Sequence, residues 1–252
     1  MTKILGLYFS GTGNTSFAVK RFVAGLSTNQ ASTLAITDPK AIEEVKNHDL
    51  IIFAYPIYFS DAPKIVKDYI NENKDKFFGK QIFVIATQGV ASGDGAGVGA
   101  RLFKKHGAKV VGGLHVKMSD SVADAWVYRN QNHAVKTAKS SEKIDKAVAR
   151  FVAGKPTKHG FGACGRVVGF SMQRLWFGRL TKSYRNKPKI SHTDCVSCGA
   201  CVRECPLGNL QLRDGELTQN EKCTLCYRCV NLCPNRALTI LGRKVYKQHI
   251  QE

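Results

Sequence analysis

Two blocks of four cysteines near the C-terminal end constrain this 252-residue chain more than any other feature. The first block comprises Cys195, Cys198, Cys201 and Cys205 and is followed by Pro206; the second comprises Cys223, Cys226, Cys229 and Cys233 and is followed by Pro234. A CxxCxxC turn brings three thiolates to one side of a metal cluster, which a regular helix or strand does not do easily. Eight of the nine cysteines lie in these blocks, and this distribution indicates metal binding rather than a disulfide scaffold.

The two blocks form an internal repeat with an offset of 28 residues, and each copy ends in a short apolar run that suits a strand. Structural zinc is the alternative, because CxxC pairs also bind zinc tetrahedrally and eight thiolates would serve two zinc ions. The CxxxCP ending of both copies favours iron–sulfur clusters, since zinc ribbons do not require it. The ninth cysteine, Cys164, is expected to be an inert residue of a core or an interface.

Residues 190–242 resemble the bacterial two-cluster ferredoxins, in which the fourth cysteine of each motif ligates the other cluster. The resemblance implies two [4Fe-4S] clusters. It assigns one cluster to Cys195, Cys198, Cys201 and Cys233, and the other to Cys223, Cys226, Cys229 and Cys205. Gly199, beside Cys198, would let the backbone approach the inorganic sulfur closely.

The first 152 residues alternate short β-branched runs with helical patterns and predict a separate α/β domain. Strands are expected at 3–9, 33–36, 50–54, 82–87 and 110–116, and helices at 15–26, 39–46, 63–71, 97–106 and 130–151. Such an alternation implies a doubly wound, five-stranded parallel sheet covered by helices on both faces. Residues 153–189 are expected to form a basic linker with an amphipathic helix, and residues 190–252 a small α+β domain.

The stretch SGTGNT, residues 10–15, follows the first strand and opens the first helix. Backbone N–H groups and the positive end of the helix can surround a phosphate there. It is neither a Walker sequence nor GxGxxG, because no GKS or GKT follows and position 16 is serine. The hydroxyls of Ser10, Thr12 and Thr15 suit a terminal phosphate monoester with three exposed oxygens, which indicates a mononucleotide.

This loop resembles the phosphate loop of the flavodoxins, whose (S/T)xTGxT pattern is matched by Ser10, Thr12, Gly13 and Thr15. The resemblance covers about residues 1–150 and implies FMN, bound at the carboxyl ends of the strands. The loops after the third and fourth strands would surround the flavin ring. The expected FMN contacts are Ser10, Gly11, Thr12, Gly13, Asn14, Thr15, Tyr55, Pro56, Ile57, Tyr58, Phe59, Thr87, Gln88, Gly89, Gly93, Asp94 and Gly95.

Tyr55, Tyr58 and Phe59 offer flat surfaces for an isoalloxazine ring, with core packing as the alternative. The loop after the fourth strand is small and rich in glycine where flavodoxins usually place an aromatic residue, so one face of the ring is expected to be open. Trp126 is a candidate cover for that face, with plain packing as its alternative. The candidate acids and bases, Asp61, Asp94, Asp120, His106 and His115, show no spacing that enforces a catalytic geometry.

The formal charge of +19 is concentrated in one segment, because residues 151–190 hold nine basic and no acidic side chains. An acidic redox partner protein suits this segment best, ahead of nucleic acid. Its amphipathic helix is expected to be a connector that packs its apolar stripe against one or both domains, with binding to an anionic membrane surface or a partner as the alternative. No stretch of eighteen apolar residues and no signal-peptide pattern occur, so a cytoplasmic location is expected.

The combination resembles flavodoxin–ferredoxin fusion proteins of anaerobic bacteria and archaea. It implies electron transfer between FMN, the clusters and external partners. A second hypothesis is an FMN-dependent reductase of a small acceptor such as a quinone, supplied by ferredoxin-type electrons. A third, non-redox hypothesis combines zinc modules with a basic nucleic-acid arm. The sequence identifies no substrate, no catalytic residue and no second nucleotide site.

Overall fold

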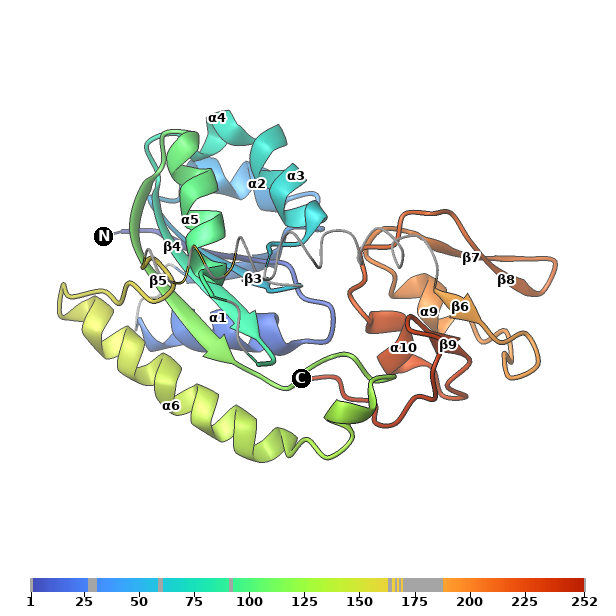
Figure 1. Ribbon diagram of the computed structural model, residues 1–252. Helices are drawn as coiled ribbons and strands as arrows, with labels where there is room; N and C mark the ends of the chain where they lie inside the picture. The colour runs from blue at the N-terminus through green and yellow to red at the C-terminus, as the bar shows by residue number, and fades with distance from the viewer. Residues whose placement is uncertain are drawn as a thin grey trace.

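The computed structural model describes residues 2–26, 31–58, 61–90, 93–162, 165, 167, 169 and 188–251. Its larger part is a five-stranded parallel sheet in the order β2-β1-β3-β4-β5 (Figure 1). The strands are β1 (Ile4–Tyr8), β2 (Ala31–Ala35), β3 (Leu50–Pro56), β4 (Gln81–Gln88) and β5 (Lys109–Lys117). This is the flavodoxin-like strand order, which reverses direction beside β1 and β3. The predicted fold class is confirmed.

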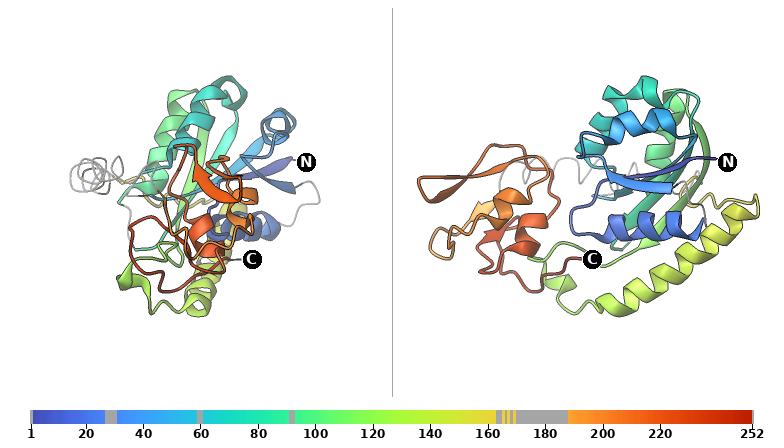
Figure 2. Two further views of the ribbon diagram at one scale, coloured as in Figure 1. Left: turned by 90° about the vertical axis from the view of Figure 1, so that its right-hand side faces the viewer. Right: turned by 180° about the vertical axis from the view of Figure 1, so that it is seen from behind.

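Helices cover both faces of the sheet (Figures 1 and 2). The helical segments are α1 (Asn14–Gly25), α2 (Ala41–Glu44), η1 (Val45–Asn47), α3 (Lys64–Glu72), α4 (Lys74–Phe77), α5 (Gly95–Lys105), η2 (Trp126–Tyr128) and α6 (His133–Val152). Side chains alternate along β3, so Phe53 packs with α3 and α5 while Ile52 packs with α1 and α6. Two apolar cores result, one on each face, as the near-continuous apolar runs of the strands predict.

Residues 157–159 add to the edge of the sheet beyond β5. Thr157 accepts a backbone hydrogen bond from Gly113 at 2.8 Å, and His159 donates one to Gly113 at 3.0 Å. Phe161 packs against the core on the α3 and α5 face. The first part of the predicted linker therefore packs against the sheet. The predicted amphipathic helix, Cys164 and Phe59 lie outside the described residues.

The C-terminal part contains β6 (Lys189–Ile190), α9 (Ala200–Arg203), β7 (Leu210–Arg213), β8 (Glu216–Gln219), α10 (Arg228–Leu232) and β9 (Leu238–Thr239). The strands form two small antiparallel sheets, β6-β9 and β7-β8. The predicted repeat is visible in the backbone. Positive φ angles recur 28 residues apart at Ser197 and Leu225, at Gly199 and Tyr227, and at Gly208 and Arg236.

The two parts are in contact, and the β7–β8 hairpin points away from the parallel sheet in both views (Figures 1 and 2). Asp124, in the loop after β5, accepts backbone hydrogen bonds from Ile240 at 2.9 Å and Leu241 at 2.7 Å. The last described residues return to the first part, where Gln251 donates a backbone hydrogen bond to Thr12 at 2.8 Å. Among the described residues, no helix is long and apolar enough to cross a membrane.

Candidate functional site

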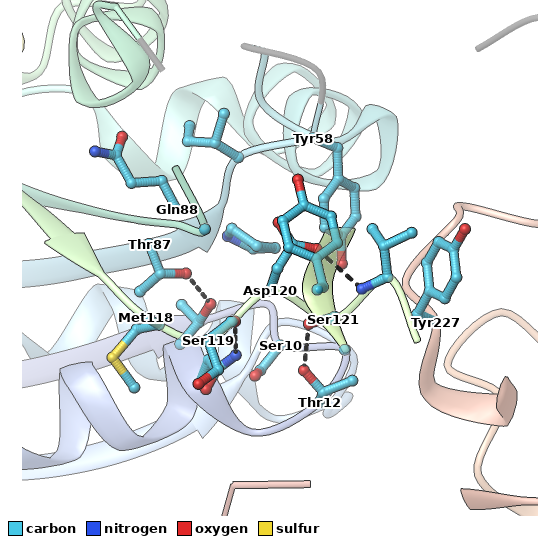
Figure 3. Close-up of a pocket in the computed structure, with 18 of the residues that line it drawn as sticks. Ser10, Thr12, Tyr58, Thr87, Gln88, Met118, Ser119, Asp120, Ser121 and Tyr227 are labelled. Carbon is cyan, nitrogen blue, oxygen red and sulfur yellow. Dashed lines mark hydrogen bonds between the residues drawn. The ribbon is translucent and has the colours of Figure 1, made fainter. Parts of the chain in front are cut away.

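A pocket of about 460 Å³ opens at the carboxyl ends of β1, β3, β4 and β5 (Figure 3). This edge is where open parallel sheets bind ligands, and the volume lies in the range of small-molecule sites. The pocket is lined by Ser10, Gly11, Thr12, Asn14, Thr15, Pro56, Ile57, Tyr58, Thr87, Gln88, Gly89, Val90, Met118, Ser119, Asp120, Ser121, Val122, Tyr128, Leu225 and Tyr227.

The turn between β1 and α1 forms the floor of this pocket. Gly13 precedes α1 with φ of 87°, a left-handed conformation that glycine adopts readily, and no side chain caps the helix. No acidic residue lies in the first turn, so no negative side chain of the helix opposes an anion at this end. Thr15 Oγ1 lies 2.7 Å from Thr87 Oγ1, and Thr12 Oγ1 lies 2.6 Å from Ser121 Oγ. These contacts fix the turn to the loops after β4 and β5.

Three buried polar atoms around the turn have no hydrogen-bond partner within the described part of the chain: Ser10 Oγ, Asn14 Oδ1 and Ser119 Oγ. All three residues line the pocket, and Figure 3 shows Ser10 and Ser119 beside Thr12. Buried polar atoms normally have partners, so unpaired ones in a pocket indicate a polar ligand. Hydroxyl groups and the N-terminal end of a helix fit a phosphate monoester with a polyol chain, as FMN carries.

The aromatic side chains divide differently from expectation. Tyr58 lines the pocket, and its pKa is raised by burial and then by the neighbouring Cys226, Cys223 and Asp120. Tyr55 is fully buried in the core, where its hydroxyl donates to Gly95 O at 2.6 Å and accepts from Gly99 N at 2.8 Å. The structure therefore corrects the expected role of Tyr55, because both its ring and its hydroxyl are used by packing against α5.

Trp126 does not line the pocket. It is 53% exposed and carries the Arg129 guanidinium 3.3 Å above its ring, so the role proposed for it as a cover is wrong. Tyr128, two residues further on, lines the pocket instead. Its pKa is raised to about 12 by burial and by the Asp120 carboxylate beside it.

In the described part of the loop after β4, only the first residues line the pocket. Gln88 and Gly89, two of the predicted FMN contacts, line the pocket together with Val90. Asp94 is completely buried and pairs with Arg101 at 2.6 Å, below the pocket and beside α5. Gly93 and Gly95 flank it and also lie outside the lining, as does Gly13 at the back of the phosphate turn. The structure therefore places these four predicted contacts outside the pocket lining.

Among the described residues that line the pocket, Asp120 is the only charged one. Its pKa is raised because it is largely buried, although a hydrogen bond from Val122 N at 2.9 Å and the nearby Lys136 act in the opposite direction. An added Cβ on Gly89 would clash with this carboxylate. Glycine is thus required there for the loops after β4 and β5 to meet.

Sequence reasoning named Asp120 as a candidate acid or base, and it missed the other pocket residues that follow β5 or belong to the C-terminal part. Met118, Ser119, Ser121 and Val122 were identifiable in principle, because they follow the carboxyl end of a strand beside the ligand edge. Leu225 and Tyr227 were not, since their place in the pocket depends on how the two parts pack.

The eight cysteines surround two small cavities in the C-terminal part. One is lined by Cys205, Cys223, Cys226 and Cys229, and the other by Cys195, Cys198, Cys201 and Cys233. Each cavity thus receives three cysteines from one copy of the repeat and the fourth from the other copy. This is the grouping that the ferredoxin resemblance implies. Among the described residues, no group of three or more His, Cys, Asp or Glu side chains is placed to hold a single metal ion.

Backbone N–H groups point at several of these thiols. Asn209 N donates to Cys205 Sγ at 3.2 Å, and Ala237 N, its equivalent in the repeat, donates to Cys233 Sγ at 3.2 Å. Such amides stabilise thiolate ligands and adjust the reduction potential of a cluster. Burial raises the pKa of the Cys226 thiol to about 12, so binding of iron must displace a proton from it.

The first cavity lies close to the pocket at the sheet edge. Cys226 is buried and belongs to the same apolar core as β1 and β3. An added Cβ on Gly11 would lie 3.0 Å from Cys226 Cβ and closer still to its carbonyl oxygen. The phosphate turn and the cysteine loop are therefore in direct contact. Cys198, the equivalent of Cys226, is exposed.

Comparison with known proteins agrees with this geometry in the C-terminal part. Residues 194–238 match the 4Fe-4S dicluster domain family. The chain joins a flavodoxin-like domain to a ferredoxin-type 4Fe-4S domain. The first assignment rests on the strand order and the second on the family match.

Individual relatives match parts of this fusion. A ferredoxin of Pyrobaculum islandicum is 40% identical over 52 residues, which are 20% of this chain and 49% of that protein. A component of an ion-translocating oxidoreductase complex of Methanosarcina acetivorans is 36% identical over 53 residues, 20% of each protein. Among solved structures, Megasphaera elsdenii flavodoxin matches 58% of this chain and 98% of its own with a TM-score of 0.45 and 19% identity. The fusion spans between about an eighth and a half of the length of the curated relatives it matches.

Proposed function

We propose that the fusion transfers low-potential electrons between FMN, two [4Fe-4S] clusters and external redox partners. FMN, when bound, exchanges one or two electrons, and each cluster exchanges one. Cys205, Cys223, Cys226 and Cys229 would hold a cluster near the flavin, here called the proximal cluster. Cys195, Cys198, Cys201 and Cys233 would hold the distal cluster.

One observation carries this proposal. The proximal cysteine loop packs directly on the phosphate turn, and Leu225 and Tyr227 of that loop line the nucleotide pocket on either side of Cys226. Two cofactors held at such a contact are positioned for exchange of electrons without a diffusing carrier. The contact also supports FMN over a substrate that must enter and leave at each turnover.

The distal cavity supports a route to the exterior. Cys198 is exposed, and Val196 beside it is 60% exposed. A cluster held there would be the accessible one, whereas Cys226 of the proximal cavity is buried against the flavodoxin-like domain. We propose an acidic protein as the external partner, because the chain carries a formal charge of +19 and opposite charge accelerates encounter.

Reduction of a small acceptor is the alternative function. It requires room beside the flavin ring, and the loop after β4 contributes no described aromatic side chain to the pocket. However, Tyr58, Tyr128 and Tyr227 line the pocket from three other segments. Their presence favours internal electron transfer over a second bound substrate.

The test begins with protein purified without oxygen. We expect about one FMN and eight iron atoms per chain, with flavin and cluster absorption bands that change together during stopped-flow reduction. A colourless protein, or a flavin band that is reduced independently of the clusters, contradicts the proposal.

Two matched variants locate the route. Cys198→Ser and Cys226→Ser remove equivalent ligands of the two copies of the repeat. We expect C226S to abolish exchange between flavin and clusters. C198S should retain exchange between flavin and proximal cluster and lose the rapid reaction with an external partner. Equal effects of both variants would contradict the proposed order of the cofactors.

A further inference from the structure

Tyr227 has a backbone conformation that its side chain does not favour. Its φ and ψ angles are 61° and 9°, in the left-handed region, directly before α10. The equivalent residue of the first copy is Gly199, with φ of 71° and ψ of 0°. Glycine adopts this conformation without a steric penalty, whereas a bulky residue there is an outlier. The second copy of the motif therefore carries a strained tyrosine where the first copy shows that glycine suffices.

The strain coincides with a specific position of the side chain. Tyr227 is 5% exposed and lines the nucleotide pocket, and Figure 3 shows it at the side of the pocket that the ferredoxin-type domain forms. Gly199 has no such role, since its side of the repeat faces the distal cavity. The tyrosine thus occurs only in the copy that meets the flavodoxin-like domain.

The surroundings hold the ring at this place. The carboxylate of Asp124 lies beside the Tyr227 hydroxyl and contributes to raising its pKa, after burial. The same carboxylate is fixed by the backbone N–H groups of Ile240 and Leu241. Tyr227 also packs with Leu225, Val230 and Leu238 in the core of the ferredoxin-type domain. These contacts fix the Tyr227 ring in place, so that it forms one side of the pocket, here called the aromatic wall.

We propose that Tyr227 is a positioning residue that closes the flavin pocket from the ferredoxin-type domain and makes retention of FMN depend on the proximal cluster loop. The inference rests on the proposed function. Residue 227, with its left-handed conformation, lies between the ligands Cys226 and Cys229, so a bound cluster would add a constraint on the loop to those that Asp124 and the apolar core provide. When the cluster is lost, the loop can relax and the aromatic wall withdraws from the pocket.

The test measures the dissociation constant of FMN in the full-length protein with intact clusters, by titration of flavin-free protein and flavin fluorescence. Tyr227→Phe keeps the ring, and Tyr227→Gly restores the residue of the first copy. Arg236→Gly is the matched control, because Arg236 also has a left-handed conformation (φ of 54°), corresponds to Gly208 in the first copy and is exposed away from the pocket. We expect Y227G to weaken FMN binding about tenfold or more. Y227F and R236G should bind FMN as the wild type does.

Removal of the clusters with an iron chelator completes the test. We expect this removal to weaken FMN binding in the wild type and to add little in Y227G, whose wall is already absent. If Y227G binds FMN like the wild type, or if the chelator weakens both proteins by the same factor, the inference is overturned. Equal loss in Y227F and Y227G would also overturn it, because the hydroxyl and not the ring would then be responsible. A wild type that binds no FMN at all would instead refute the proposed function.

Discussion

Substitution of Gly11 by alanine tests the contact on which the electron route depends. Gly11 is buried in the phosphate turn, and an added Cβ would lie 3.0 Å from Cys226 Cβ and closer still to the Cys226 carbonyl oxygen. Restoring an ordinary contact of 3.4 Å to that Cβ needs a shift of at least 0.4 Å between the two loops. The neighbour is backbone, which does not yield cheaply. Overpacking of this kind costs about 1–3 kcal/mol.

The assay compares Gly11→Ala with Gly162→Ala. An added Cβ at Gly162 meets no atom of the described residues within 4 Å, and its φ is not positive. We expect G11A to lower the thermal midpoint by about 2–4 °C for each kcal/mol lost and to slow exchange between flavin and proximal cluster. Iron content should stay at the wild-type level, because no ligand is removed. If G11A and G162A share the same midpoint and the same exchange rate, the two loops do not touch as described.

Three further predictions use single side chains. Asp124→Ala removes a buried acceptor of two hydrogen bonds between the domains, each worth about 1.5–3 kcal/mol when the acceptor is charged. We expect this variant to be cleaved faster than the wild type in limited proteolysis. Asp145→Ala, which changes a surface residue, should be cleaved at the wild-type rate. Ser10→Ala should weaken FMN binding about tenfold to a hundredfold without destabilising the flavin-free protein, because the Ser10 hydroxyl has no hydrogen-bond partner among the described residues. The control, Ser16→Ala, should leave FMN binding unchanged. Burial raises the pKa of Asp120, so this residue destabilises the folded protein increasingly as the pH rises through that pKa. We therefore expect Asp120→Asn to be more stable than the wild type in urea denaturation at pH 7. The variant should lose this advantage below pH 3.8, where the carboxyl is protonated in both the folded and the unfolded protein.

The sequence predicted those features that depend on local periodicity or on motif spacing. All five strands of the parallel sheet were predictable from apolar runs, because both faces of each central strand are buried. The phosphate turn was predictable from SGTGNT, which follows a strand and opens a helix. The grouping of the cysteines followed from the resemblance to two-cluster ferredoxins and agrees with the two cavities.

The errors concern side chains whose direction is set by tertiary packing. Tyr55 lies at the end of β3 and Tyr58 follows the same strand three residues later, and the sequence does not show which of the two side chains points into the core. Tyr55 does so because its hydroxyl bonds with the start of α5. Within the short helix η2, Tyr128 lines the pocket whereas Trp126 is exposed, and the sequence does not distinguish these two positions either. The contribution of Leu225 and Tyr227 was out of reach, since no local pattern encodes the packing of two domains.

The departures from symmetry between the two copies of the repeat indicate how one motif serves two roles. Cys226 is buried against the flavodoxin-like domain, whereas Cys198 is exposed to solvent. Solvent exposure and nearby hydrogen bonds are among the factors that set the potential of a cluster. The proximal and distal clusters should therefore titrate as two separate one-electron steps in an EPR-monitored redox titration. Substitution of Leu225 by serine, its equivalent residue Ser197 in the first copy, should bring the two midpoints closer together by making the proximal environment more polar. A single merged step in the wild type would show that the burial of Cys226 does not distinguish the clusters.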